Sequence, residues 1–161
     1  MKKVLKRLCL IIVLLIIIYI LYLYTLYDYI FYSSIIETSI PIFAKMEEED
    51  THSGFHGDGD AVIKIYFSDK QTEMFTRKVE NNIHWNKLPM NETLQNCISD
   101  NNINEKFETL VQNGYWFFID RHSQSIDKYN YNEIFNKASF NYSIAIFDIE
   151  SNILYIYSLD T

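Results

Sequence analysis

Glycine is scarce in this chain. Only four of the 161 residues are glycine, and three of them lie between positions 54 and 59. Glycine adopts backbone conformations that other residues avoid, and it lets another backbone or a ligand come close. These glycines argue against a helix and predict an ordered, sharply turning loop that presents His52, His56, Asp58 and Asp60. Turn chemistry alone, in which aspartates accept hydrogen bonds from nearby backbone N–H groups, also explains the pattern.

Cysteine is rarer still, with two residues in the whole chain. Cys9 lies in an apolar segment and Cys97 in the polar part, so an intramolecular disulfide is not expected. A single cysteine such as Cys97 is more often a small, partly buried apolar side chain than a nucleophile. Cysteine therefore supplies neither a disulfide framework nor a clear catalytic group.

Basic residues are few outside the first seven positions. From Thr38 onward the chain has nineteen acidic against ten basic residues, which gives a net charge near −9. An acidic domain repels the phosphate backbone of nucleic acid. We therefore expect no nucleic-acid partner.

One long stretch, residues 8–27, has no charged side chain. Twenty helical residues span about 30 Å, the thickness of the hydrocarbon core of a bilayer. Four basic residues precede it, Lys2, Lys3, Lys6 and Arg7, and they predict a cytoplasmic N-terminus with the remainder exported. The run is longer than that of a usual signal peptide and lacks a small-x-small cleavage site. We expect an uncleaved anchor, with cleavage near Ser33-Ser34 as the alternative.

These patterns divide the chain into four parts. We expect a cytoplasmic basic end at residues 1–7, a transmembrane anchor at 8–30, a juxtamembrane linker at 31–49 and an extracytoplasmic domain at 50–161. Residues 45–50, which contain four consecutive acidic residues, favour a solvated spacer between anchor and domain. The expected location is the cell membrane, crossed once.

A helix is predicted directly after the first strand-forming segment. Residues 61–67 are rich in β-forming side chains and predict a strand. Ser68 with Gln71 three residues later fits a capping box. The helix that follows has an apolar stripe that would pack on a sheet, formed by Met74, Phe75, Val79 and Ile83.

Three further strands complete the predicted domain. Residues 115–119 are apolar at every position, which is typical of a strand covered on both faces. Residues 140–147 and 153–159 flank a polar turn and predict a closing hairpin. The expected fold class is α+β: an N-terminal transmembrane helix, then a four-stranded, largely antiparallel sheet packed by one or two helices.

Three motifs occur together in this domain: Thr51-His52-x-Gly54-Phe55-His56-Gly57-Asp58-Gly59, Phe118-Ile119-Asp120-Arg121-His122-Ser123, and Phe140-Asn141-Tyr142 followed by Ala145-Ile146-Phe147-Asp148. With these motifs, residues 50–161 resemble a family of small exported proteins of Gram-positive bacteria. The resemblance implies an exported domain, but it brings no activity, ligand or catalytic residue. Ser53 departs from the pattern, which has glycine after the first histidine.

The polar residues of these motifs suggest several kinds of chemistry. Imidazole and carboxylate groups at Asp50, His52, His56, Asp58 and Asp60 suit zinc or another divalent ion, although their spacing matches no recognised metal site and a solvated loop explains them as well. Asp120, His122 and Ser123 are of the three residue types that form a catalytic triad. Neighbours along a chain cannot adopt the geometry of a triad, however.

The second polar segment has its own alternatives. His122 is able to titrate near neutral pH, whereas Asp120 and Arg121 beside it also fit a structural ion pair. If the strands at 61–67 and 115–119 run antiparallel, as we expect, the two His-bearing segments converge at one end of the sheet. There they would form either a shared polar site for a small ligand or divalent ion, or a hydrogen-bonded corner that binds nothing.

The sequence thus predicts a membrane-anchored extracytoplasmic domain that serves as a non-catalytic binding or interaction module. Its partner would be an extracytoplasmic protein or a small ligand. The alternative is a metal- or small-ligand-binding domain, with or without enzymatic activity, centred on the loop of His52 and His56 and on Asp120-Arg121-His122. A third hypothesis is an accessory subunit of another membrane protein. The cofactor, if any, stays open.

Overall fold

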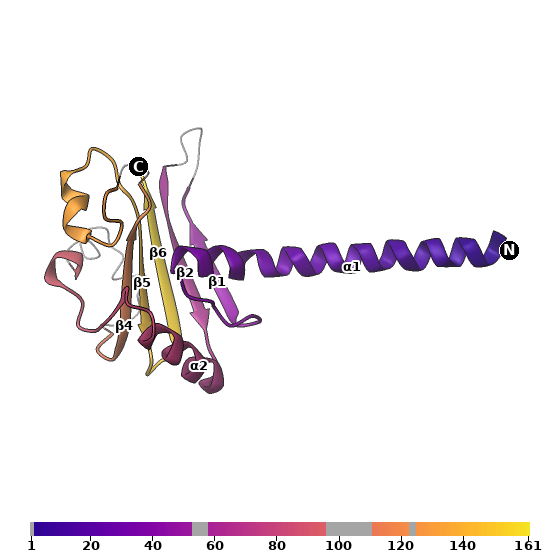
Figure 1. Cartoon of the computed structure of the whole chain (residues 1–161), viewed down its shortest axis with the longest axis horizontal. Helices are drawn as coiled ribbons and strands as arrows, with labels where there is room; N and C mark the ends of the chain where they lie inside the picture. Colours follow the sequence, from indigo (N-terminus) through magenta and orange to yellow (C-terminus); the bar gives the residue numbers. More distant parts are fainter. Residues whose placement is uncertain (1, 53–57, 96–110, 123–124) are drawn as a thin grey trace.

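The computed structural model describes residues 2–52, 58–95, 111–122 and 125–161. A long helix, α1 (Lys2–Ile35), leads into a six-stranded antiparallel sheet with the strand order β1-β2-β6-β5-β4-β3. The strands are β1 (Lys45–Asp50), β2 (Gly59–Tyr66), β3 (Trp85–Lys87), β4 (Gly114–Asp120), β5 (Asn141–Asp148) and β6 (Ile153–Asp160). A second helix, α2 (Asp69–Glu80), and a 3-10 helix, η1 (Tyr131–Asn136), pack around them. Figure 1 shows α1 extending far from the sheet, with the N-terminus at its distant end.

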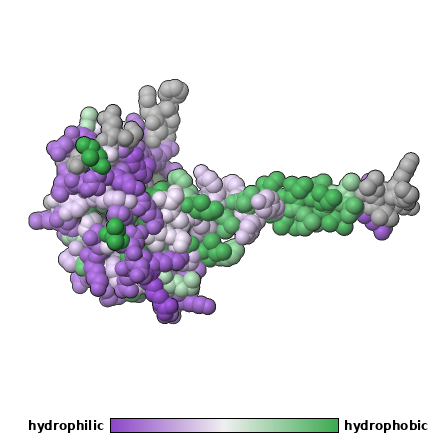
Figure 2. Space-filling view, in the orientation of Figure 1, coloured by the Kyte–Doolittle hydropathy of each residue, from purple (hydrophilic) through white to green (hydrophobic). Residues whose placement is uncertain are grey.

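Helix α1 is apolar along most of its length. The segment Lys6–Ile35 has a mean hydropathy of 2.9 over its most apolar window, and none of that window is buried inside the molecule. Figure 2 shows this part as a continuous hydrophobic rod beside a mostly hydrophilic domain. Among the residues that the structure describes, α1 is the one helix long and apolar enough to cross a membrane. It runs past the predicted limit of residue 30 as far as Ile35.

The sheet is covered on both faces. The face that packs against α2 and the end of α1, here called the helix face, carries Ile63, Phe117, Phe147 and Ile156. The opposite face carries Val62, Phe118, Ile144 and Tyr157, and is covered by Met90, Leu94 and Ile134. Side chains alternate between the faces along each strand. Strands buried on both sides therefore need apolar residues at nearly every position, as in β4, where all seven residues are buried.

The end of α1 is part of the hydrophobic core. Tyr32 is 5% exposed and Ile36 is completely buried, both within the cluster that fills the helix face. Ile40 and Ala44, in the turn that follows, belong to the same cluster. Part of the segment predicted as a juxtamembrane linker, residues 31–49, therefore packs against the sheet.

Hydrogen bonds hold the chain just beyond α1, at the segment Ile36-Glu37-Thr38, which we call the junction. Trp85 Nε1 donates to the Ile36 carbonyl oxygen at 3.3 Å and to Thr38 Oγ1 at 3.0 Å. The Glu37 carboxylate accepts from Lys128 Nζ and from the Tyr129 hydroxyl, both at 2.6 Å. Burial opposes ionisation of Glu37, but these two donors outweigh it and hold its pKa below the ordinary value.

Strand β1 corrects the prediction of a solvated spacer at 45–50. It pairs along its full length with β2 and forms one edge of the sheet. Only Met46 is partly buried, while Glu47, Glu48, Glu49 and Asp50 are exposed. The acidic side chains did not prevent a strand because an edge strand can direct them to solvent, where they also discourage pairing with another chain.

The other strands follow the prediction with one addition. The hairpin of β5 and β6 is confirmed, and its turn is closed by the Asp148 carboxylate, which accepts from Glu150 N at 2.9 Å and from the Ser151 hydroxyl at 2.7 Å. Strand β3 is only three residues long and pairs with β4. The prediction of four strands was wrong because it omitted the two edge strands, β1 and β3.

Helix α2 confirms half of its predicted stripe. It begins after Ser68, whose backbone N–H donates to Gln71 Oε1 at 2.9 Å, the reciprocal bond of a capping box. Phe75 and Val79 are buried on the helix face, but Met74 is 45% and Ile83 is 88% exposed. Ile83 lies beyond the end of the helix at Glu80, so it cannot follow the helical spacing.

We expect Phe75→Ala to lower the free energy of unfolding by about 3 to 5 kcal/mol, because the ring is completely buried against Phe147 and Trp85. The matched control is Met74→Ala on the exposed side of the same helix, with an expected change below about 0.5 kcal/mol. Denaturant unfolding followed by circular dichroism measures both. Equal losses would show that α2 does not pack as described.

Candidate functional site

The polar residues of the two predicted segments gather at one end of the sheet. Strand β2 starts there, β6 ends there, β5 starts there and β4 ends there. Gly59 pairs with Asp160, Asp160 pairs with Asn141, and in the next row Tyr142 pairs with Asp120. Strands β2 and β4 are antiparallel to each other, with β6 and β5 between them. The expected direction of these strands is therefore confirmed.

Asp160 joins the two segments. His52 Nε2 lies 3.1 Å from Asp160 Oδ2, and Arg121 Nη2 lies 3.0 Å from the same carboxylate. The other imidazole nitrogen of His52, Nδ1, lies 2.5 Å from Asp50 Oδ1. A chain of alternating charge, Asp50–His52–Asp160–Arg121, thus runs across the end of the sheet, and we call it the charged row. All four side chains are partly exposed.

Close backbone approach lets the charged row form. A Cβ atom added to Gly59 would lie 2.5 Å from the Cα of His52, nearer than real Cβ atoms come. Only glycine allows the chain around His52 to lie this close to the start of β2. One of the scarce glycines therefore serves packing between two backbone segments.

Strand alternation separates the other predicted residues from the charged row. Asp120 and Arg121 are consecutive, so they point to opposite faces of the sheet. Asp120 is 4% exposed and pairs with Lys137, on the face opposite the charged row. Asp60 accepts a hydrogen bond from the Thr51 hydroxyl, in a bridge that closes the strand pair. By the register, Asp60 lies on the same face of the sheet as Asp120, whereas Asp50, which pairs with Ala61, lies on the face of the charged row.

The remaining predicted residues have various positions. The backbone N–H of His122 donates to Asp120 Oδ1 at 2.9 Å, so this pair forms a turn just after β4. Asp58 is exposed before β2. His56 lies outside the described residues, as do Cys97 and Ser123. The structure therefore brings His52 and Arg121 together through Asp160, and joins Asp120 and His122 through a local turn.

The environment shifts the ionisation of three of these groups. Burial opposes protonation of His52, but its bonds to Asp50 and Asp160 outweigh this and raise its pKa above 6.5. Hydrogen bonds from the backbone and imidazole of His52 lower the pKa of Asp50. Burial opposes ionisation of Asp120, yet the bond from Lys137 and the His122 N–H hold its pKa below the ordinary value. Each shift favours the charged form, as in a structural ion pair.

An open hollow lies beside the end of β4. Its volume is about 510 Å³, and its walls include Arg121, His122, Lys128 and Tyr129. Within the described parts of the chain, no three His, Cys, Asp or Glu side chains are grouped so that they could hold a metal ion. Two buried polar atoms at this end of the sheet, Arg121 Nε and Asn141 Oδ1, have no hydrogen-bond partner among the described residues.

Sequence reasoning missed Asp160, the residue that connects the two segments. Its signal was present, because it directly follows the strand predicted at 153–159 and belongs to a hairpin whose ends meet at this edge. Histidines and glycines marked the other candidate residues, and neither type is adjacent to Asp160 in the sequence.

Comparisons with family models, with curated proteins and with solved structures found no match. The function of the chain is therefore inferred from its sequence and geometry alone.

The charged row makes folding stability depend on pH. Because the pKa of His52 is higher in the folded chain than its ordinary value of 6.5, folding favours the protonated imidazole. The stabilisation is complete below that ordinary pKa and is lost as the pH rises through the folded-state pKa. We expect His52→Gln to cost up to about 1 kcal/mol near pH 5.5 and much less near pH 9.

Denaturant unfolding at the two pH values measures this difference. In an Asp160→Asn background the effect of His52→Gln should shrink, because one partner of the imidazole has lost its charge. A cost that does not change with pH would contradict the ion pairs described here.

Proposed function

We propose that the chain is a single-pass membrane protein whose N-terminus is cytoplasmic and whose sheet domain is a non-catalytic binding module outside the membrane. The observation that carries this proposal is the continuity between the apolar helix and the core. Helix α1 has no buried residues in its most apolar window, yet its last turn and the junction are built into the helix face of the sheet. This construction supports a domain held in a fixed orientation at the bilayer surface.

The charge distribution supports the orientation. Lys2, Lys3, Lys6 and Arg7 precede the span, and a basic flank stays in the cytoplasm. The segment after the junction has more acidic than basic residues. Acidic residues contribute little to membrane orientation, so this excess does not oppose export of the domain.

The chemistry of the polar residues supports binding over catalysis. A general acid must be free to donate a proton to a substrate, and a general base must be free to accept one. Here His52 is held between two carboxylates and Asp120 is paired with Lys137, so both are committed to structural partners. Such groups stabilise the end of the sheet, and the outer surface of the domain remains for an extracytoplasmic protein or a small ligand.

A topology experiment tests the proposal. A phosphatase that is active only outside the cytoplasm, fused after Thr161, should be active, and a fluorescent protein that folds only in the cytoplasm should stay dark at the same position. In the control, Lys2, Lys3, Lys6 and Arg7 are all changed to Asn, which should reduce the phosphatase signal. A dark phosphatase with a bright fluorescent fusion would overturn the orientation.

A second candidate is a site for a small ligand or divalent ion at the charged row. The observation in its favour is the unpartnered, buried Arg121 Nε, a cationic N–H donor beside an open hollow that Lys128 also lines, which suits a small anion better than a metal ion. Titration of the full chain in detergent with inorganic phosphate, read by thermal stability, separates the two functions. Our proposal predicts no stabilisation. Saturable stabilisation that is lost in Arg121→Gln but kept in Arg77→Gln, at an exposed residue of α2, would favour the second candidate.

A further inference from the structure

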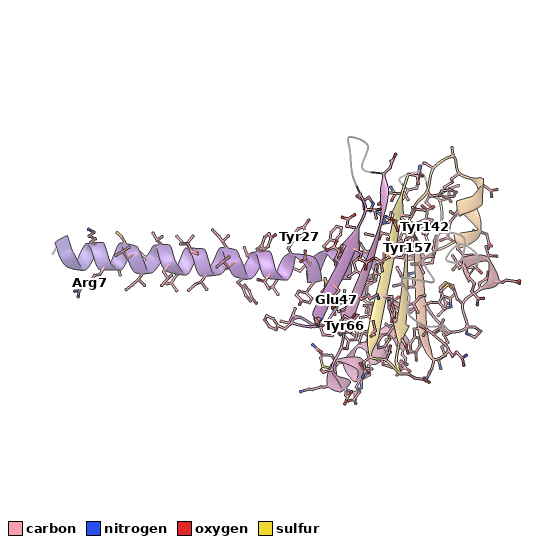
Figure 3. All side chains as sticks on the ribbon, turned by 180° about the vertical axis from the view of Figure 1, so that it is seen from behind. Arg7, Tyr27, Glu47, Tyr66, Tyr142 and Tyr157 are labelled. Carbon is pink, nitrogen blue, oxygen red and sulfur yellow. The ribbon has the colours of Figure 1, made fainter. Side chains whose placement is uncertain are left out.

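The turn between α1 and β1 exposes two large apolar side chains. Ile42 is 48% and Phe43 is 68% exposed, although Ile40 and Ala44 on either side are buried in the core. Buried residues on both sides pin the turn, so Ile42 and Phe43 are held outward. Figure 1 shows this purple turn reaching past β1 toward the side from which α1 extends, and Figure 3 shows the same from behind.

The backbone of Phe43 is in an unusual conformation. Its φ is +65°, in the left-handed region that favours glycine and is a genuine outlier for a bulky residue. A residue in this region costs about 1 to 3 kcal/mol, persists only where the surrounding structure holds it, and is found most often at functional sites. Packing within the described part of the domain does not account for an exposed phenylalanine here.

The height of the turn relative to the membrane follows from α1. If residues 8–27 fill the hydrocarbon core, Tyr29 lies about 3 Å beyond its edge, because each helical residue rises 1.5 Å. The Tyr29 hydroxyl donates to the Ala44 carbonyl oxygen at 2.7 Å. Helical side chains point back toward the N-terminus, which here is the direction of the bilayer centre. The bond therefore holds Ala44 at the depth of Tyr29 or deeper in the bilayer. The adjacent Phe43 therefore lies at headgroup height.

We propose that the α1–β1 turn, through Ile42 and Phe43, inserts into the interface of the same bilayer that α1 crosses. The inference rests on the proposed membrane span and extends it. A second contact with the bilayer, besides α1, would fix the tilt of the domain relative to the membrane, which a single helix would not. The occupant is lipid because the turn continues the apolar surface of α1, which has exposed aromatic rings at Tyr24 and Tyr27. Aromatic side chains concentrate at this depth in membrane proteins.

Depth-dependent quenching tests this contact. Phe43→Trp is made in the full chain and reconstituted in vesicles of phosphatidylcholine and phosphatidylglycerol, with or without bromine-labelled phosphatidylcholine. The unaltered chain, which contains Trp85 and Trp116, gives the background. We expect the added fluorescence to be blue-shifted and mostly lost in brominated vesicles. Ile42→Trp, read in the same way, covers the case in which Phe43→Trp does not fold.

Two controls make the outcomes distinct. Leu15→Trp lies within the span and should be quenched, whereas Ile83→Trp, at a residue 88% exposed on the domain, should emit as in water. Quenching of Leu15→Trp without quenching at positions 42 and 43 would overturn the second contact alone. An unquenched Leu15→Trp would overturn the span itself, and the second contact with it.

Discussion

The burial of the end of α1 in the core sets the orientation of the whole domain on its helix. Ile36 is completely buried on the helix face, and the backbone beside it is held by Trp85 from β3 and by Asn82 from the segment after α2. Lys128 and Tyr129 add two bonds to Glu37 from the segment beyond β4. A domain attached by a flexible linker turns freely on its anchor, but here packing and hydrogen bonds fix one orientation. The position of β1 and of the turn before it relative to α1 follows from this arrangement.

Paired charges hold the other end of the sheet together. Four strand ends meet there, and alternation along each strand separates Asp120 from Arg121 although they are neighbours in sequence. On the helix face, Asp160 balances His52 and Arg121. On the opposite face, Lys137 balances Asp120. Partly buried charges are stable only when they are paired. The charged row on one face and the pair of Lys137 with Asp120 on the other therefore hold the loops at this end of the sheet in place.

The sequence predicted the elements whose pattern of apolar side chains indicates which residues are buried. Strand β4 and the hairpin of β5 and β6 are apolar, and α2 has both a capping pair and two buried aromatic or branched residues, Phe75 and Val79. Strand β1 was missed because its conformation depends on backbone hydrogen bonds to β2. The side chains of β1 gave no sign of this pairing. The convergence of the His-bearing segments followed from strand direction alone. The separation of Asp120 from Arg121 follows from alternation along β4. The linking role of Asp160 required the register, which depends on all four strands together.

Unfolding of Ile36→Ala in the full chain shows whether α1 and the sheet form one folded unit. If Ile36 is part of the domain core, the substitution should lower the free energy of unfolding of the sheet domain by about 2 to 5 kcal/mol. Ile30→Ala, at a residue of α1 that is 64% exposed, provides the matched control and should change it by less than about 0.5 kcal/mol. Denaturant unfolding in detergent, followed by near-ultraviolet circular dichroism, measures both. A change as small for Ile36→Ala as for Ile30→Ala would contradict a shared core, because the helix would then be only a tether.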